Sequence, residues 1–86
     1  MASYKLVFKQ SVAKDLRSLP KKDIARILNR IDSLTENPRP AGCEKLAGQD
    51  RYRLRQGVYR IIYEIKDDTV IVTTFKIGHR REIYKT

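Results

Sequence analysis

The stretch from residue 51 to residue 65, RYRLRQGVYRIIYEI, alternates polar and apolar side chains on both sides of Gln56-Gly57. A period of two is typical of a strand with one buried face, and a glycine between two such runs is typical of a hairpin turn. Tyr52 and Leu54 share one face of the first strand. The apolar face of the second strand consists of Tyr59, Ile61, Tyr63 and Ile65. If both apolar faces join one core, the opposite sheet face collects Arg51, Arg53, Arg55 and Arg60.

The N-terminal half has the pattern of one strand followed by two helices. Alternation over residues 4–8 predicts a short strand. Ser11 is a plausible N-cap for a first helix, which Pro20 ends because the residue before a proline avoids helical dihedrals. A second helix is predicted from an apolar stripe at helical spacing, formed by Ile24, Ile27, Leu28, Ile31 and Leu34. Asn37-Pro38 closes it.

Residues 37–50 are rich in turn formers and are expected to form a loop. A turn at Asp67-Asp68 then leads into a strand over Thr69–Ile77, which Gly78 ends. The β-branched and aromatic residues of this last strand occupy both faces, which favours a central position in the sheet. The sequence therefore predicts an α+β fold in β-α-α-β-β-β order, with two N-terminal helices on one face of a small, mainly antiparallel sheet.

Composition limits the function classes. The 86 residues suffice for one small domain spanning residues 1–86, and the formal net charge is +9. Such a charge favours an acidic partner such as nucleic acid, although a soluble basic protein without one has the same composition. The single cysteine, Cys43, excludes an intramolecular disulfide and favours the cytoplasm. No apolar run is long enough for a membrane helix.

The element order, the GVYRIIYEI strand and the closing GHRREIY together resemble the RelE/ParE toxin superfamily of bacteria and archaea. This resemblance implies the toxin of a type II toxin–antitoxin pair, neutralised by a cognate antitoxin that wraps it with a partly disordered segment. RelE-like members are ribosome-dependent endoribonucleases that cut mRNA in the ribosomal A site. ParE-like members poison DNA gyrase instead. A basic nucleic-acid-binding module without catalysis is a third hypothesis.

Residue by residue, the RelE pattern implies a catalytic set of Arg53, Arg55, Arg60, Arg80 and Tyr84. The presence of the full set favours the RelE branch, with the ribosome and mRNA as partners. In the best-known RelE branch the two residues of the first hairpin strand are lysines. Arginine, with a pKa above about 12, clamps phosphate well but is a poor base. The substitution leaves the identity of the general base open.

Three residues are candidates for the base. Glu44 has suitable chemistry, and some relatives use a glutamate in this loop. His79 is the only histidine, a residue that titrates near neutral pH. Tyr84 is the third candidate, and it alternatively stacks on a base. Further basic residues expected to contact RNA are Lys45, Arg51, Lys76 and Arg81. The spacing of Cys, His, Asp and Glu suggests no metal site, and no cofactor is expected.

Overall fold

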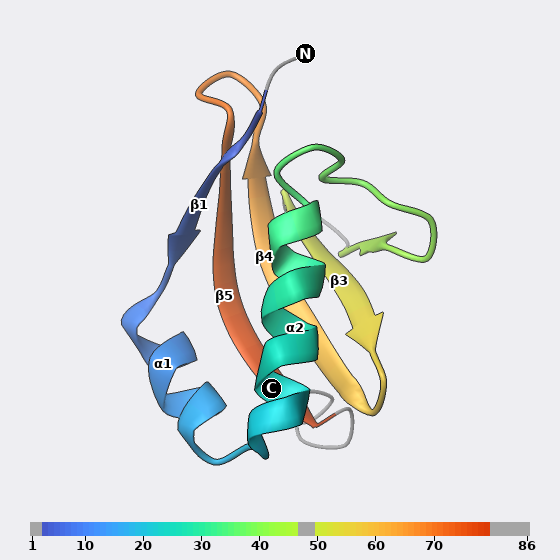
Figure 1. The fold of residues 1–86 in the computed structure, drawn as a ribbon. Coiled ribbons are helices and arrows are strands. Elements are labelled where there is room, and N and C mark those ends of the chain that lie inside the picture. Colours follow the sequence, from blue (N-terminus) through green and yellow to red (C-terminus); the bar gives the residue numbers. More distant parts are fainter. Residues whose placement is uncertain (1–2, 47–49, 80–86) are drawn as a thin grey trace.

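The computed structural model describes residues 3–46 and 50–79, and Figure 1 shows their arrangement. Strand β1 (Lys5–Phe8) leads into helices α1 (Gln10–Arg17) and α2 (Lys21–Ser33). A long segment then reaches the short strand β2 (Glu44–Lys45). Strands β3 (Arg51–Gln56), β4 (Tyr59–Lys66) and β5 (Ile71–His79) follow. The α+β architecture is confirmed, with β2 as an addition to the predicted order.

The strands form one sheet in the order β1-β5-β4-β3-β2. As predicted, β3, β4 and β5 make an antiparallel meander, and β5 is an interior strand, between β1 and β4. Strand β1 pairs with β5 in parallel, so the sheet is mixed. Glu44 lies opposite Arg53 and Lys45 opposite Tyr52, where the sequence predicted only a loop. A two-residue polar strand has no apolar alternation, so its pattern cannot distinguish it from a loop.

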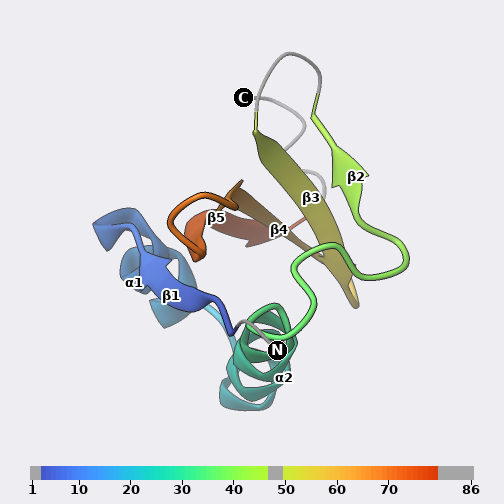
Figure 2. The ribbon, with the colours of Figure 1, turned by 90° about the horizontal axis from the view of Figure 1, so that it is seen from above.

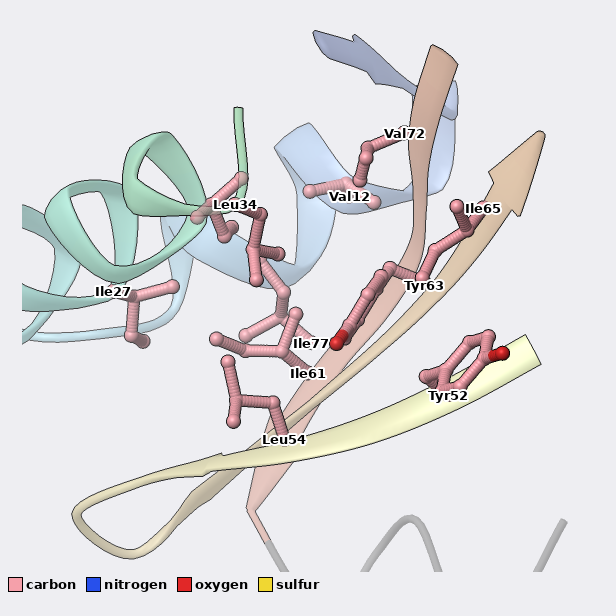
Figure 3. Packing of buried hydrophobic residues seen from close by; sticks show 11 residues of the cluster. Val12, Ile27, Leu34, Tyr52, Leu54, Ile61, Tyr63, Ile65, Val72 and Ile77 are labelled. Atoms are coloured by element: carbon pink, nitrogen blue, oxygen red, sulfur yellow. The ribbon is translucent and has the colours of Figure 1, made fainter. Parts of the chain in front are cut away.

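Both helices cover the same face of the sheet (Figure 2). Helix α1 packs mainly on β5, and α2 contacts β3. The core between the two layers holds the predicted apolar residues of β3 and β4 together with Ile27, Ile31 and Leu34 (Figure 3). Tyr52, Leu54, Ile61, Tyr63 and Ile65 are all buried, which confirms the predicted core face of the hairpin. The face that carries the arginines is therefore turned away from the helices.

Several predicted element ends and one predicted core residue of α2 are wrong. Ser11 is inside α1, where its hydroxyl donates to the Phe75 carbonyl at 3.4 Å, and the N-cap is Lys9. Strand β5 continues through Gly78 to His79 because Gly78 still pairs with Arg60. Leu28, assigned to the buried stripe of α2, is 39% exposed. Element ends depend on contacts with distant strands, which local periodicity does not report.

The segment between α2 and β2 is held by side chains that we call the Arg39 clasp: Arg39, Asp67, Tyr4 and Tyr52. Arg39 donates to both Asp67 oxygens, at 3.2 and 2.7 Å, and to the Tyr52 hydroxyl at 3.1 Å. The Tyr4 hydroxyl donates to Asp67 at 2.7 Å. The buried Tyr63 hydroxyl donates to the neighbouring Pro38 carbonyl at 2.8 Å. These bonds tie the segment leading to Glu44 to the sheet.

Candidate functional site

Basic side chains from three strands share the sheet face opposite the helices, and we call it the arginine face. Directly paired residues lie on the same side of a sheet. Arg53 pairs with Ile62, and Arg55 with Arg60. Ile62 in turn pairs with Lys76 of β5. The basic residues of the arginine face are Arg51, Arg53, Arg55, Arg60 and Lys76. The prediction that Arg53 and Arg60 project to one side is confirmed.

Glu44 is an acidic group at the edge of the arginine face. Its carboxylate accepts a hydrogen bond of 2.5 Å from the Arg53 guanidinium, and the pair is partly exposed. This bond and the charge of Arg53 lower the pKa of Glu44 below its ordinary value, with smaller contributions from the charges of Arg55 and Arg60. Glu44 is therefore ionised at neutral pH and lies within the field of all three arginines.

Arg60 is buried, which the sequence did not predict. Its side chain is only 2% exposed, whereas Arg55 directly opposite is exposed. The side chains of a sheet face opposite the helices are expected to be solvent-accessible, and for Arg60 this expectation is wrong. Like charges directly opposite on neighbouring strands destabilise a sheet. Stability alone therefore gives no reason for an Arg55–Arg60 pair, whereas the binding of an anion does.

Two candidate site residues lie on the helix side of the sheet. His79 pairs with Tyr59, and their rings meet edge to face with centroids 6.3 Å apart. The Tyr59 hydroxyl donates to Asp23 of α2 at 2.8 Å, which fixes the side on which this pair lies. Lys45 pairs with the core residue Tyr52. Of the two described base candidates, only Glu44 is therefore on the arginine face.

Comparison with known proteins identifies the family. The family model described as the ParE toxin of the type II toxin–antitoxin system parDE matches residues 6–84. The RelE1 protein of Methanocaldococcus jannaschii is 35% identical over 78 residues, which cover 86% of this chain and 87% of the relative. This chain belongs to the RelE/ParE toxin family. Toxin RelG of Mycobacterium tuberculosis is 29% identical over 86 residues, covering 95% of this chain and 97% of the relative.

Solved RelE structures share the fold of this toxin. RelE in the archaeal RelE–RelB complex of Pyrococcus horikoshii matches with a TM-score of 0.79 and 31% identity, covering 91% of this chain and 96% of that one. A mutant of E. coli RelE in the free state matches with a TM-score of 0.78 and 28% identity, covering 96% and 92%. Three of these four relatives are named RelE, which agrees with the branch that the sequence favoured.

The remaining predicted site residues of the toxin, Arg80, Arg81 and Tyr84, lie outside the described residues. Within residues 3–46 and 50–79, no cluster of three or more His, Cys, Asp or Glu is placed to hold a metal ion. No helix in the same ranges is long and apolar enough to cross a membrane.

Sequence reasoning missed Phe75, an aromatic residue that approaches the arginine face. The ladder between β4 and β5 shifts at Ile62/Tyr63, so that Lys76 pairs with Ile62 and Thr74 with Tyr63. Phe75 is the extra residue of this bulge. The Arg51 guanidinium carbon lies 4.1 Å from the centroid of its ring. The run TVIVTTFKI contains no break in β propensity at this point, so its sequence gives no signal for the bulge.

Proposed function

We propose that this toxin is a ribosome-dependent endoribonuclease that cuts mRNA in the A site. The reaction is attack of a ribose 2′-hydroxyl on the adjacent phosphorus, with expulsion of the 5′-oxygen. The observation that carries the proposal is the arginine face, with Arg55 and Arg60 directly opposed and Arg53 one step along the ladder. Several guanidiniums on one surface match the charge and geometry of a phosphodiester.

The reaction requires removal of the 2′ proton, stabilisation of the phosphorane and protonation of the leaving oxygen. Arg53 and Arg60 supply positive charge for the phosphorane, and Arg55 adds to the same field. Because Arg60 is buried, its position is fixed before substrate arrives, as electrostatic stabilisation requires. The family resemblance adds Arg80 to these cations and gives Tyr84 the role of stacking on a base or orienting the 2′-hydroxyl.

Glu44 is the base that the geometry supports best. The hydrogen bond from Arg53 is the largest cause of its lowered pKa. When a phosphate oxygen takes over this guanidinium, the carboxylate loses that bond and becomes a stronger base. Substrate binding thus activates Glu44 at the moment when a proton must be removed. His79 is a weaker candidate, because it lies beside Tyr59 on the helix side.

We further propose an antitoxin with acidic and apolar residues as the cognate partner. RelE relatives from Pyrococcus horikoshii and E. coli were solved in complex with RelB. In this chain the net charge of +9 suits an acidic segment. The exposed Phe8 and Leu28 border a mainly apolar groove that suits an apolar one. Folding of a disordered antitoxin segment on binding is the expected mode.

The test is cleavage of mRNA on purified, programmed ribosomes, mapped by primer extension. We expect wild-type toxin to cut within the A-site codon and to leave the same mRNA intact when ribosomes are omitted. Glu44→Gln should lower the rate at least 100-fold, within the range for a general base. The matched control is Lys45→Gln, the neighbouring residue on the other sheet face, which should cut at the wild-type rate. Wild-type cutting by Glu44→Gln would remove Glu44 from the mechanism.

The match to the ParE family model supports a second candidate, inhibition of DNA gyrase. The two functions separate in cells that express the toxin. Gyrase poisoning gives DNA breaks with intact mRNA, whereas the proposed nuclease gives cuts in translated frames with intact DNA. DNA breaks without mRNA cuts would move the toxin to the gyrase branch.

A further inference from the structure

We propose that Phe75 and Arg51 form a stacking subsite for one nucleobase of the mRNA beside the scissile phosphate. This inference deepens the proposed nuclease function and rests on it. Phe75 is a base-binding residue in this assignment, and Arg51 completes the subsite. The subsite gives a function to two features that phosphate binding does not require. These are an aromatic residue in a bulge on a basic surface and an arginine stacked on its ring.

The bulge at Phe75 brings two consecutive residues, Phe75 and Lys76, to the arginine face. Alternation from the buried Thr74 places Phe75 on the arginine face, and without a bulge Lys76 would point to the helix side. The extra residue instead interrupts the ladder between the Ile62–Lys76 and Tyr63–Thr74 pairs. Bulges re-aim side chains and are enriched next to active sites. Here the bulge holds a partly exposed aromatic ring beside Lys76, a residue of the arginine face.

The contact between Arg51 and the Phe75 ring shows that the ring lies on the arginine face. Arg51 projects from β3, two strands away from β5, and pairs with Glu64 of the intervening strand. Its guanidinium nevertheless lies 4.1 Å from the Phe75 ring centroid. The Lys9 ammonium is 5.1 Å from the same centroid. The ring is thus held among cations, and the Arg51 guanidinium lies over it as a stacked nucleobase would.

The subsite is close to the phosphate-binding arginines. Arg53 follows Arg51 by two residues on the same face of β3 and pairs with Ile62, whose other partner is Lys76. Two strand spacings, about 10 Å, separate β3 from β5. When Arg53 binds a phosphate of an RNA strand, a neighbouring base of that strand is therefore within reach of the Phe75 ring.

The chemistry favours a nucleobase over an acidic peptide. A carboxylate is satisfied by a guanidinium alone and gains nothing from an aromatic ring. Single-stranded RNA, in contrast, is gripped by stacking of its bases on aromatic rings and on arginine planes. The ring and the guanidinium together offer both kinds of surface beside cations that attract the backbone. A stacking contact also tolerates any base, so the subsite positions the strand without reading its sequence.

The experiment combines side-chain substitutions in the toxin with base removal in the mRNA and measures cleavage on programmed ribosomes. Phe75→Leu keeps an apolar side chain but removes the ring, and it should lower kcat/KM about 5- to 150-fold, the range for one base–aromatic stack. Phe75→Tyr keeps the ring and should stay near wild type. Val58→Ala is the control and should cut at the wild-type rate, because Val58 is an apolar residue, 50% exposed, in the turn between β3 and β4.

The decisive templates carry a single abasic nucleotide at successive positions around the cut. At one position, removal of the base should slow the wild type and abolish the difference between wild type and Phe75→Leu. If that difference persists on every abasic template, Phe75 only supports the fold and the subsite is refuted. Unchanged cleavage by Phe75→Leu on intact mRNA refutes it as well, and a simultaneous loss of antitoxin binding would assign the ring to a protein contact. If wild-type toxin cuts no ribosome-bound mRNA, the proposed nuclease function fails, and the subsite fails with it.

Discussion

Hydrogen bonds to the Asp67 carboxylate join three separate parts of the chain. Asp67 accepts from Arg39 in the segment after α2 and from Tyr4 just before β1, while it lies itself in the turn after β4. Hydrogen bonding from Arg39 is the largest cause of a lowered pKa of Asp67, and the hydrogen bond from Tyr4 is the next. Together they bring this pKa below its ordinary value of 3.8. A group whose pKa is lowered in the folded state stabilises that state above its unfolded pKa. The contribution is lost as the pH falls through the folded pKa.

We therefore expect Asp67→Asn to have a lower Tm than wild type at pH 7. The difference should shrink as the pH falls below about 5 and vanish below the lowered pKa, because both proteins then carry a neutral side chain. Thermal melts across this pH range measure it. Asp68→Asn is the control, since Asp68 accepts from the Thr69 backbone N–H and the amide keeps an acceptor for that bond. A Tm difference independent of pH would show that the Asp67 charge does not support the clasp.

Arg60 shows where residue-level prediction fails. The pleat of a strand predicted on which side Arg60 lies, because alternation is a property of the local backbone. Its burial, at 2% exposure, depends on what other parts of the fold cover it, and alternation does not contain that information. Truncation of a buried side chain of this size is therefore expected to leave a cavity and to affect the fold.

Arg60→Met separates charge from packing, because methionine fills much of the same space without the guanidinium. We expect this variant to melt as one cooperative transition and to cut ribosome-bound mRNA at least 100-fold more slowly, as for loss of one oxyanion donor. Arg60→Ala should lose activity and also several degrees of Tm, because it leaves a cavity. Full cleavage by a folded Arg60→Met would exclude Arg60 from the stabilisation of the phosphorane.

At the scale of elements, the two turns of the meander use different residues for similar tasks. Gly57, with φ of 62°, opens the β3–β4 loop, and glycine adopts this conformation without strain. Val70 has φ of 57° before β5, which is unfavourable for a β-branched residue. The sequence predicted both turns from Gly and Asp. It did not predict the strained valine, because strand propensity assigns Val70 to the strand itself.

Val70→Gly should relieve this strain and raise the free energy of unfolding by about 1 kcal/mol, less than the full strain because glycine gains freedom in the unfolded chain. For a domain of this size the expected rise in Tm is about 4–8 °C. Val58→Gly, at a turn residue whose φ is not positive, is the control and should not raise the Tm. A Tm of Val70→Gly at or below that of wild type would show that Val70 is not strained in solution.

For the whole molecule, the sequence predicted the layers and the meander because each depends on periodicity and short turns. It did not predict the two-residue strand β2, although β2 places Glu44 beside Arg53. The segment that leads to Glu44 is held by the Arg39 clasp, whose members are far apart in sequence and share no motif. The candidate site was therefore predictable in its charge and its sheet face, but not in the position of its base.

The most direct measurement of the proposed activity uses the substrate rather than the protein. Ribosomes are programmed with mRNA that carries one 2′-deoxy nucleotide at the cut, and cleavage by wild-type toxin is compared with that of the all-ribose template. We expect the single deoxy substitution to abolish the cut at that bond, and the all-ribose product to end in a 2′,3′-cyclic phosphate. Cutting of the deoxy template at the ribose rate would contradict attack by the 2′-hydroxyl and the role proposed for the arginine face.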